Sequence, residues 1–255
     1  MCADAPEPLS APSESRANEQ QAESATPELT VIVPMFNEAK TIAELLRRVL
    51  ASPVSKQVIV VDDGSKDGSR GIVEGLVAEH PEIELLCHPA NRGKGAAIRT
   101  GLANARGQYT IIQDADLEYD PADYRVLLGA ARERGTPVVY GSRILGGRPM
   151  SYRSYYWGGR LVSLVASLLY GQWITDEATC YKLFRTDFLQ SLPLRDDGFG
   201  FCAEATALAR RRGARIVEVP IQYAPRSMAE GKKIRWTDGV RALWLLLKYR
   251  FVRRK

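Results

Sequence analysis

The strongest constraint on the fold of this chain is a regular alternation between short apolar runs and segments with helical character. Runs rich in β-branched or apolar residues occur at 29–33, 58–61, 83–87, 109–113, 138–141 and 216–223. Helical segments are predicted between them, near 38–51, 67–79, 95–105, 121–134 and 202–212. Continuous apolar strands that alternate with helices favour an α/β fold, in which a mostly parallel sheet has helices on both faces. Ligands of such sheets bind beyond the carboxyl ends of the strands, so the residues that follow each strand form the candidate site.

The most informative strand end is the acidic stretch after the run at 109–113. Asp114 and Asp116 stand two positions apart on extended chain, so both carboxylates project to the same side. Two carboxylates that converge in a pocket repel each other unless a cation lies between them. Oxygen ligands without His or Cys select Mg²⁺ or Mn²⁺, which commonly bridge to a diphosphate. Glu118 is placed to add a third oxygen, and a solvated acidic loop is the alternative interpretation.

Three other strand ends carry side chains of the kind that bind nucleotides. Asp62 and Asp63 leave the second run in different directions, so at least one carboxylate is available to a base or to ribose hydroxyls. A glycine-rich turn that includes Lys94 leads into a helix, and a helix N-terminus can cradle an anion. Arg143 follows the fifth run and suits a bidentate grip on phosphate, although it could equally neutralise one of the aspartates after the fourth run.

Together the strand ends carry a resemblance to a known family. The motifs VIVPMFNE, VIVVDDGSKDGS, NRGKGAA, QDADLE and GSR resemble, in order and spacing, those of the inverting family-two glycosyltransferases of the GT-A fold. The segment 176–185 resembles the acceptor side of the dolichyl-phosphate (polyprenyl-phosphate) mannose and glucose synthase branch. A C-terminal signature at 218–234 is similar to that of the same branch, so the resemblance covers about 29–239.

The resemblance implies a role for each of these strand ends. Asp114 and Asp116 would hold Mg²⁺ or Mn²⁺ against the diphosphate of a GDP-mannose or UDP-glucose type of donor, with Glu118 at the position of a third ligand. The ion would offset charge on the departing nucleoside diphosphate. The implied nucleotide-binding residues are Pro34, Phe36, Glu38, Asp62, Asp63 and Lys94. The implied phosphate-binding residues are Arg143, Arg226 and either Lys232 or Lys233.

The acceptor is either a phosphate or a hydroxyl group. A hydroxyl acceptor needs a general base, and related enzymes usually carry an aspartate where this chain has Cys202, although Glu204 or Asp197 could still serve. A phosphate monoester is already a dianion near neutral pH and attacks without a base. We therefore expect transfer to a polyprenyl phosphate; the alternatives are a hydroxyl acceptor and a non-catalytic nucleotide-sugar-binding protein. The residues expected to carry catalysis are Asp114, Asp116, Arg143 and Glu204.

The charge of the chain is concentrated at its two ends. The 255 residues carry a formal net charge of +5, but residues 1–27 hold five acids and one base, whereas residues 226–255 hold ten bases and two acids. We expect a disordered acidic tail over 1–27, one catalytic domain over 28–225 and a basic aromatic segment over 226–255. Such a segment suits an anionic membrane surface, and the alternative is a helix packed on the domain. One helical face there would contain Val240, Leu243, Trp244, Leu247 and Phe251.

Composition and spacing disfavour several other classes of protein. The four cysteines are widely spaced and form no CxxC pair, so they are expected to be reduced thiols of a cytoplasmic protein. The longest apolar uncharged run, 161–175, is shorter than the roughly 20 residues that span a bilayer. The basic cluster is a single helix tail, which disfavours nucleic acid. The sequence thus predicts a peripheral protein at the cytoplasmic membrane face and leaves its oligomeric state open.

Overall fold

The structure is a computed structural model that describes residues 26–147, 153–226 and 236–252. Most of the expected acidic tail, together with Lys232 and Lys233, lies outside the described residues. Seven strands form one sheet in the order β3-β2-β1-β4-β6-β5-β7. Their bounds are β1 Leu29–Met35, β2 Lys56–Asp62, β3 Ile83–Cys87, β4 Tyr109–Ile112, β5 Val138–Ser142, β6 Lys182–Arg185 and β7 Ile216–Pro220.

The sheet is mostly parallel, as the sequence predicts, with one reversed strand. β1 lies between β2 and β4 and runs parallel to both, and β3 continues the parallel set from β2. β6 is antiparallel to both β4 and β5, whereas β7 is parallel to β5. β6 is not predictable from local sequence, because its four residues, KLFR, offer neither a long apolar run nor clear alternation.

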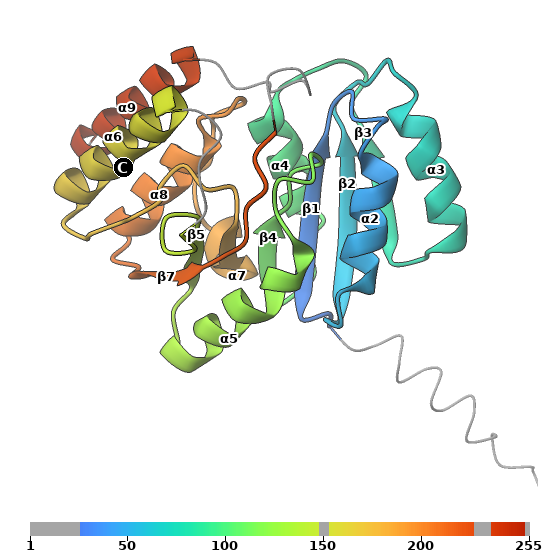
Figure 1. Cartoon of the computed structure of the whole chain (residues 1–255), viewed down its shortest axis with the longest axis horizontal. Helices are drawn as coiled ribbons and strands as arrows, with labels where there is room; N and C mark the ends of the chain where they lie inside the picture. The colour runs from blue at the N-terminus through green and yellow to red at the C-terminus, as the bar shows by residue number, and fades with distance from the viewer. Residues whose placement is uncertain (1–25, 148–152, 227–235, 253–255) are drawn as a thin grey trace, which may run out of the picture.

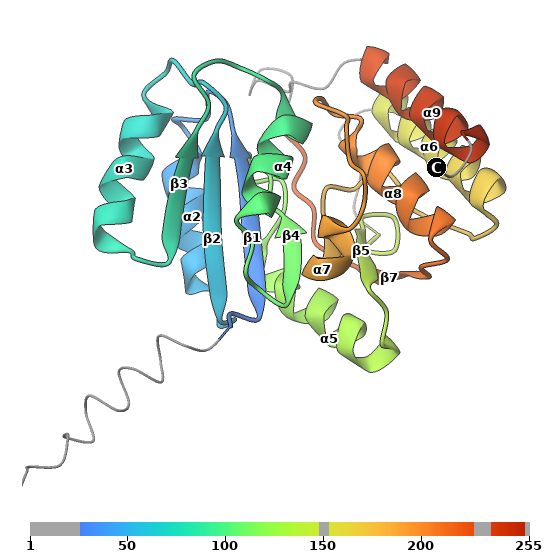
Figure 2. The same cartoon turned by 180° about the vertical axis from the view of Figure 1, so that it is seen from behind.

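Helices cover both faces of the sheet, which confirms the expected architecture (Figures 1 and 2). One face carries α2, α3 and α5, and the other carries α4, α7 and α8, with α6 and α9 packed beyond α8. A short 3₁₀ turn over Pro121–Asp123 precedes α5. The helix bounds are α2 Ile42–Ala51, α3 Ser69–Glu79, α4 Lys94–Ala103, α5 Tyr124–Arg134, α6 Arg153–Tyr170, α7 Thr186–Gln190, α8 Phe201–Arg211 and α9 Trp236–Phe251.

The central strand β1 shows how the sequence sets the two layers of core. Its residues alternate: Val31 and Val33 pack in the core beneath α2 and α5, while Ile32 packs in the core beneath α4. All three side chains are fully buried, and each such burial contributes about 1.5–3 kcal/mol relative to exposure. Strands fixed in this way hold their carboxyl ends, and the loops that follow, in defined places.

The C-terminal helix α9 has two apolar sides. It packs on α6 and α8 through Leu245, Leu246 and Tyr249. The expected amphipathic helix is therefore present and packed on the domain, but the side that the sequence singled out faces mainly outward. Of that set, Val240, Trp244, Leu247 and Phe251 are exposed and Leu243 is half-buried. In the described parts of the chain, no helix is both long and apolar enough to cross a membrane.

Candidate active site

The chain leaves β4 through a glutamine that is held by two tyrosines. Gln113 is fully buried, and its Oε1 accepts hydrogen bonds from the hydroxyls of Tyr124 (2.7 Å) and Tyr181 (2.6 Å). Two residues further on, the carbonyl oxygen of Ala115 accepts a hydrogen bond from Oγ1 of Thr41 at 2.7 Å. These bonds fix the backbone at the carboxyl end of β4. They therefore hold the backbone next to Asp114 and Asp116 in a defined place.

The first of these aspartates, Asp114, is paired with a lysine. Lys94, the first residue of α4, places its Nζ 2.5 Å from Oδ1 of Asp114 and 3.1 Å from Sγ of Cys180. Burial alone would raise the pKa of Asp114, but the charge of Lys94 and hydrogen bonds from Cys180 and Lys94 leave that pKa below its usual value. Two residues expected in different roles, one in metal binding and one in nucleotide binding, are therefore direct partners.

The second aspartate, Asp116, has acidic neighbours. Burial, followed by the negative charges of Asp114 and Glu118, raises the pKa of Asp116 to about 7. Its Oδ1 accepts a hydrogen bond from the amide of Glu118 at 3.1 Å, across a turn in which Leu117 has a left-handed φ of 63°. A divalent cation beside Asp114 and Asp116 would relieve this repulsion. The two carboxylates therefore fit the Mg²⁺ or Mn²⁺ that the sequence predicts.

Glu118, the expected third ligand, makes other contacts in this structure. Its two carboxylate oxygens accept hydrogen bonds from the Tyr223 hydroxyl and the Arg226 amide, each at 2.8 Å. Within residues 26–147, 153–226 and 236–252, no group of three or more His, Cys, Asp or Glu side chains is arranged to hold a metal ion. In this arrangement Glu118 anchors the segment that follows β7, and its role as a third ligand stays a prediction.

Glu38 and Arg226, predicted to bind the nucleotide and a phosphate of donor or acceptor respectively, form an ion pair with each other. Nη2 of Arg226 lies 3.0 Å from Oε2 of Glu38, and both side chains are largely buried. Nε of Arg226 also donates to the carbonyl oxygen of Asp116 at 2.7 Å. Arg226 thus ties the chain after β1 to the Asp116 turn. Pro34 lies inside β1, which continues past the predicted strand end, and Phe36 follows the strand directly.

The two carboxylates at the end of β2 bind other parts of the protein. Asp63 is 3% exposed and accepts hydrogen bonds from Nδ1 of His88 at 2.7 Å and from the amides of residues 92–93 at 2.9 and 2.7 Å. Asp62 is 2% exposed and accepts from the amide of Ser65 at 3.0 Å. In this structure neither carboxylate is open to a base or ribose as expected. They shape the loops that lead into α3 and α4, and their nucleotide contact stays a prediction.

The N-terminus of α4, expected to cradle an anion, is covered by a neighbouring loop. The amide of Gly95 donates to the carbonyl oxygen of Gly198, and the amide of Ala96 donates to that of Asp197, both at 3.2 Å. At Gly93, φ is 101° and an added Cβ would lie 2.3 Å from the Asp197 oxygen. The glycine-rich turn therefore serves the close approach of two loops, and carbonyl oxygens occupy the place of the expected anion.

Arg143 has a buried partner that the sequence analysis did not assign. Its Nε and Nη2 donate to the two carboxylate oxygens of Asp176, each at 2.7 Å, and its amide donates to the same side chain at 2.9 Å. Burial alone would raise the pKa of Asp176, but Arg143 lowers that pKa below its usual value. The guanidinium also lies over the Tyr223 ring at 5.1 Å. The bidentate grip predicted for Arg143 is thus made to a carboxylate. The only sequence signal for Asp176 is that it opens the segment 176–185.

Glu204 is corrected from a candidate general base to a structural residue. Its fully buried carboxylate accepts hydrogen bonds from the amides of residues 195–196 at 2.9 and 2.8 Å and from the Tyr249 hydroxyl. In this position the carboxylate is out of reach of a substrate, and its hydrogen bonds hold the loop before α8 and helix α9. Asp197, the other candidate base, is exposed and paired with Arg99.

Comparison with known proteins identifies related sequences and folds. The sequence profile of Glycosyl transferase family 2 matches residues 30–192. The undecaprenyl-phosphate mannosyltransferase of Micrococcus luteus is 32% identical over 212 residues, which cover 79% of this chain and 85% of that protein. The dolichyl-phosphate beta-glucosyltransferase ALG5A of Trichomonas vaginalis is 27% identical over 237 residues, which cover 86% of this chain and 72% of that protein.

A solved structure shares the arrangement of strands and helices. The mannosyltransferase PcManGT from Pyrobaculum calidifontis, in complex with GDP-Man and Mn²⁺, matches with a TM-score of 0.53 and 25% sequence identity. The match covers 77% of this chain and 56% of that one.

Proposed function

Because this chain belongs to glycosyl transferase family 2, we propose that it transfers a hexose from a nucleoside diphosphate sugar to a polyprenyl phosphate, with inversion at the anomeric carbon. Membership of the family makes the chain a glycosyltransferase, and its mostly parallel α/β sheet is the fold of that family. Two relatives are named for transfer to lipid phosphates, one of mannose and one of glucose. The proposed donor is accordingly of the GDP-mannose or UDP-glucose type.

The observation that carries the choice of acceptor is the state of the two candidate bases. Glu204 is buried under three hydrogen-bond donors, and Asp197 is held by Arg99. Cys202, at the position where related enzymes carry an aspartate, directs its Sγ toward the carbonyl oxygen of Thr179 at 3.6 Å. A hydroxyl acceptor would need one of these groups to remove its proton. A phosphate dianion needs no base, so the arrangement favours a phosphate acceptor.

The proposed reaction is a single displacement. An oxygen of the acceptor phosphate forms a bond to the anomeric carbon while the bond from that carbon to the diphosphate oxygen breaks. The nucleoside diphosphate leaves with the electron pair, and no proton changes place. The protein's task is therefore to bind and orient two anionic reactants and to balance charge, which is the electrostatic part of catalysis.

Asp114 and Asp116 are the residues that would hold Mg²⁺ or Mn²⁺. When bound, such an ion offsets the negative charge that develops on the leaving diphosphate. A related solved structure contains Mn²⁺ together with its donor, which supports this part of the proposal. Lys94 keeps Asp114 ionised by its proximity, and Arg226 fixes the backbone of Asp116 from the other side.

The lipid nature of the proposed acceptor sets where the enzyme works. A polyprenyl chain is held in a bilayer, so the active site has to reach the membrane surface. We propose that the protein is peripheral at the cytoplasmic face of the membrane. The support is the basic and aromatic C-terminal segment together with the acceptors named for the relatives.

The test is a transfer assay with the full chain in detergent. Labelled GDP-mannose and UDP-glucose are each incubated with Mn²⁺ and undecaprenyl phosphate. We expect one of them to give a product that extracts into organic solvent and is hydrolysed by mild acid. The absence of such a product with any common nucleotide sugar would overturn the proposed acceptor.

A variant of Asp197, the exposed candidate base, distinguishes a phosphate acceptor from a hydroxyl acceptor. Asp197→Asn should keep at least about half of the wild-type rate, since no base is needed for a phosphate. Loss of transfer in Asp197→Asn with donor binding intact would instead support a hydroxyl acceptor. Arg99→Gln, which removes the partner of Asp197 without removing the acid, is the matched control.

A further inference from the structure

Helix α6 presents a line of large apolar side chains to the outside. Trp157, Leu161, Leu164 and Leu168 follow one another at steps of four, three and four residues, which places them on one side of the helix. All four are exposed, Leu168 by 75%. The opposite side of the helix contains Val162 and Ala166, which are buried in the core. The outward side is therefore apolar and exposed among residues 26–147, 153–226 and 236–252.

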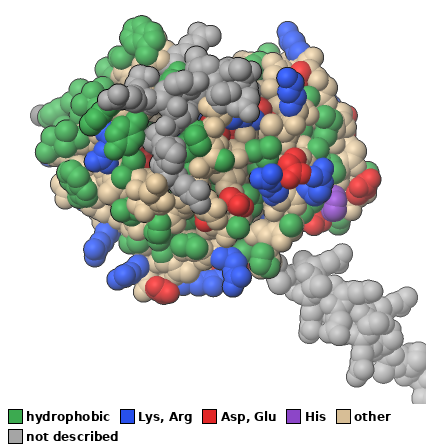
Figure 3. Space-filling view, viewed as in Figure 1, with side chains coloured by type: hydrophobic (Ala, Val, Ile, Leu, Met, Phe, Trp, Pro, Cys, Tyr) green, Lys and Arg blue, Asp and Glu red, His purple; other side chains and the backbone are tan. Residues whose placement is uncertain are grey.

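Helix α9 presents a second such line beside the first. Its exposed residues include Trp236 at 79%, Trp244 at 53% and Phe251 at 76%. The helices are in contact, and the Tyr170 hydroxyl of α6 donates to the carbonyl oxygen of Leu246 in α9 at 2.7 Å. We call the exposed sides of these two helices the α6–α9 face. Figure 3 shows hydrophobic side chains gathered on the side of the molecule where Figure 1 places these helices.

The charged residues of α6 and α9 are mainly basic. Their sequences hold five basic residues and one acid, Asp238. Lys248 lies over the Trp244 ring at 4.7 Å, so a basic and an aromatic side chain share one place on the face. Basic residues interleaved with exposed aromatic residues are the composition of helices that lie in an anionic lipid interface.

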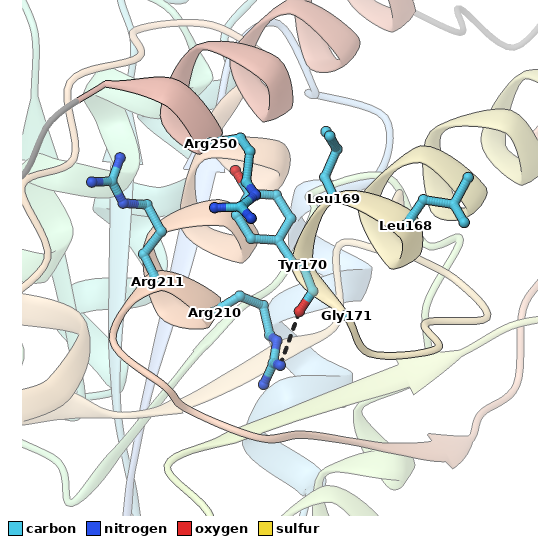
Figure 4. A pocket seen from close by; sticks show the side chains of 7 residues that line it. All are labelled: Leu168, Leu169, Tyr170, Gly171, Arg210, Arg211 and Arg250. Atoms are coloured by element: carbon cyan, nitrogen blue, oxygen red, sulfur yellow. Dashed lines mark hydrogen bonds between the residues drawn. The ribbon is translucent and has the colours of Figure 1, made fainter.

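An arginine-lined cavity lies where α6, α8 and α9 end. It measures about 590 Å³, and Arg210, Arg211 and Arg250 line it together with Leu168 and Tyr170 (Figure 4). Leu168 also belongs to the apolar line of α6, so the cavity and the α6–α9 face are continuous. Figure 4 shows the Arg211 side chain directed away from Arg210 and Arg250, so the last two supply the guanidinium groups of the cavity. Guanidinium groups favour an anionic group, and phosphate oxygens match their geometry.

Two of the arginines are held in place by the fold. Arg210 donates to the carbonyl oxygens of Ala214 at 2.6 Å and Tyr170 at 3.1 Å, and Arg211 donates to that of Tyr249. These bonds satisfy carbonyl groups near the helix ends. The Nε of Arg210 is nevertheless buried without a hydrogen-bond partner, and Arg250, from α9, lines the same cavity. The cavity therefore keeps hydrogen-bond donors for a ligand.

We infer that the α6–α9 face docks on an anionic phospholipid bilayer and that the arginine-lined cavity binds a lipid phosphate at its edge. The apolar side chains enter the interface, and the guanidinium groups meet the headgroups beside them. This inference deepens the proposed function, on which it rests, because it names the partner that brings the enzyme to a membrane-held acceptor. The cavity lies at the C-terminal end of α8. The loop before the N-terminal end of α8 is the one that contacts the start of α4, beside the proposed donor site. The cavity and the donor site are therefore separate.

The test is flotation of the full chain with vesicles. The protein is mixed with vesicles of phosphatidylcholine alone or with about 30% phosphatidylglycerol, a level that gives an anionic surface. We expect flotation with the anionic vesicles and little with the neutral ones. Arg250→Gln should weaken binding to anionic vesicles about fivefold, the effect of one basic residue near such a surface. Leu168→Asp should weaken it at least about tenfold, because an apolar contact is replaced by a charge.

A matched control distinguishes binding through the α6–α9 face from a general effect of the protein's positive charge. Arg134→Gln removes an exposed arginine of α5, on another side of the molecule, and should leave flotation unchanged (Figure 1). Equal effects of Arg134→Gln and Arg250→Gln would overturn the inference, as would equal binding to neutral vesicles or no flotation at all, the result expected if a protein partner covers the face. A cavity for free phosphate would show as a rise in Tm with inorganic phosphate, lost in Arg250→Gln, without flotation.

The wild-type protein distinguishes this inference from the proposed function. Transfer to polyprenyl phosphate in detergent requires no bilayer, so it reports on the reaction alone. Transfer without flotation would overturn the docking surface and leave the function standing. Flotation without transfer would do the reverse.

Discussion

Two pairs of aspartates stand at carboxyl ends of strands in the same sheet, and they serve different purposes. Asp62 and Asp63, after β2, are almost fully buried, and their oxygens accept hydrogen bonds chiefly from backbone amides. Asp114 and Asp116, after β4, are half-buried, and desolvation followed by repulsion from Asp114 and Glu118 raises the pKa of Asp116 to about 7. Carboxylates surrounded by amides build loops. Carboxylates that repel each other suit a cation, which is the role proposed for Asp114 and Asp116.

The largest expected effect concerns the second pair. Asp116→Asn should lower the rate of sugar transfer by about 10²–10³-fold, the usual effect of losing one group that balances developing charge. Its Tm should stay the same or rise, because the substitution removes a half-buried charge that Asp114 and Glu118 repel. Initial rates with labelled donor and a thermal unfolding curve measure the two effects. A variant with the wild-type rate would remove Asp116 from the site.

The first pair should respond in the opposite way. Asp63→Asn leaves His88 or one of the loop amides without its acceptor, so we expect a loss of about 1–3 kcal/mol in the free energy of unfolding. Denaturant unfolding measures it. Asp187→Asn, an exposed aspartate of α7, is the control and should change stability by less than about 0.5 kcal/mol. An Asp63→Asn protein as stable as that control would show that Asp63 does not build the loop.

The pH dependence of metal binding sharpens the comparison further. Since the pKa of Asp116 in the folded protein lies above its usual value, the folded state holds this proton more tightly than the unfolded state. The contribution of Asp116 to the free energy of unfolding therefore falls as the pH rises from the usual pKa of aspartate to about 7. A cation competes with that proton, so Mn²⁺ affinity should rise about tenfold per pH unit below the pKa and level off above it. Titration calorimetry at several pH values measures this slope, and a flat profile would contradict the assignment.

The smallest expected effect tests Glu118, which is next to the second pair in sequence but resembles the first in its contacts. Glu118→Gln keeps one acceptor for the Tyr223 hydroxyl or the Arg226 amide and should cost about 1 kcal/mol of stability. Mn²⁺ affinity should change by less than about tenfold, below the range seen when the support of a metal ligand is lost. A larger loss of affinity would restore Glu118 as the third ligand.

The sequence predicts the sheet and the strand ends well, because apolar runs and turn residues are local signals. Six of the seven strands, the acidic stretch after β4 and the family follow from such signals. The partners of the charged residues do not follow from local signals. Arg143 pairs with a carboxylate 33 positions away, and Arg226 pairs with one 188 positions away. Such pairs depend on where each crossover returns the chain to the sheet, which no local pattern encodes. For the same reason the sequence does not reveal the three donors that surround the Glu204 carboxylate.

The reversed strand β6 also has a consequence for synthesis of the protein. β5 pairs only with β6 and β7 among the strands described, so residues 138–142 have no edge of the sheet to join until residues 182–185 have been made. The parallel unit of β1 to β4 needs nothing beyond residue 112. On the ribosome we therefore expect the half of the sheet that carries Asp114 and Asp116 to form first. The half that carries Arg143 then joins it through four residues, in one late closure that completes the site.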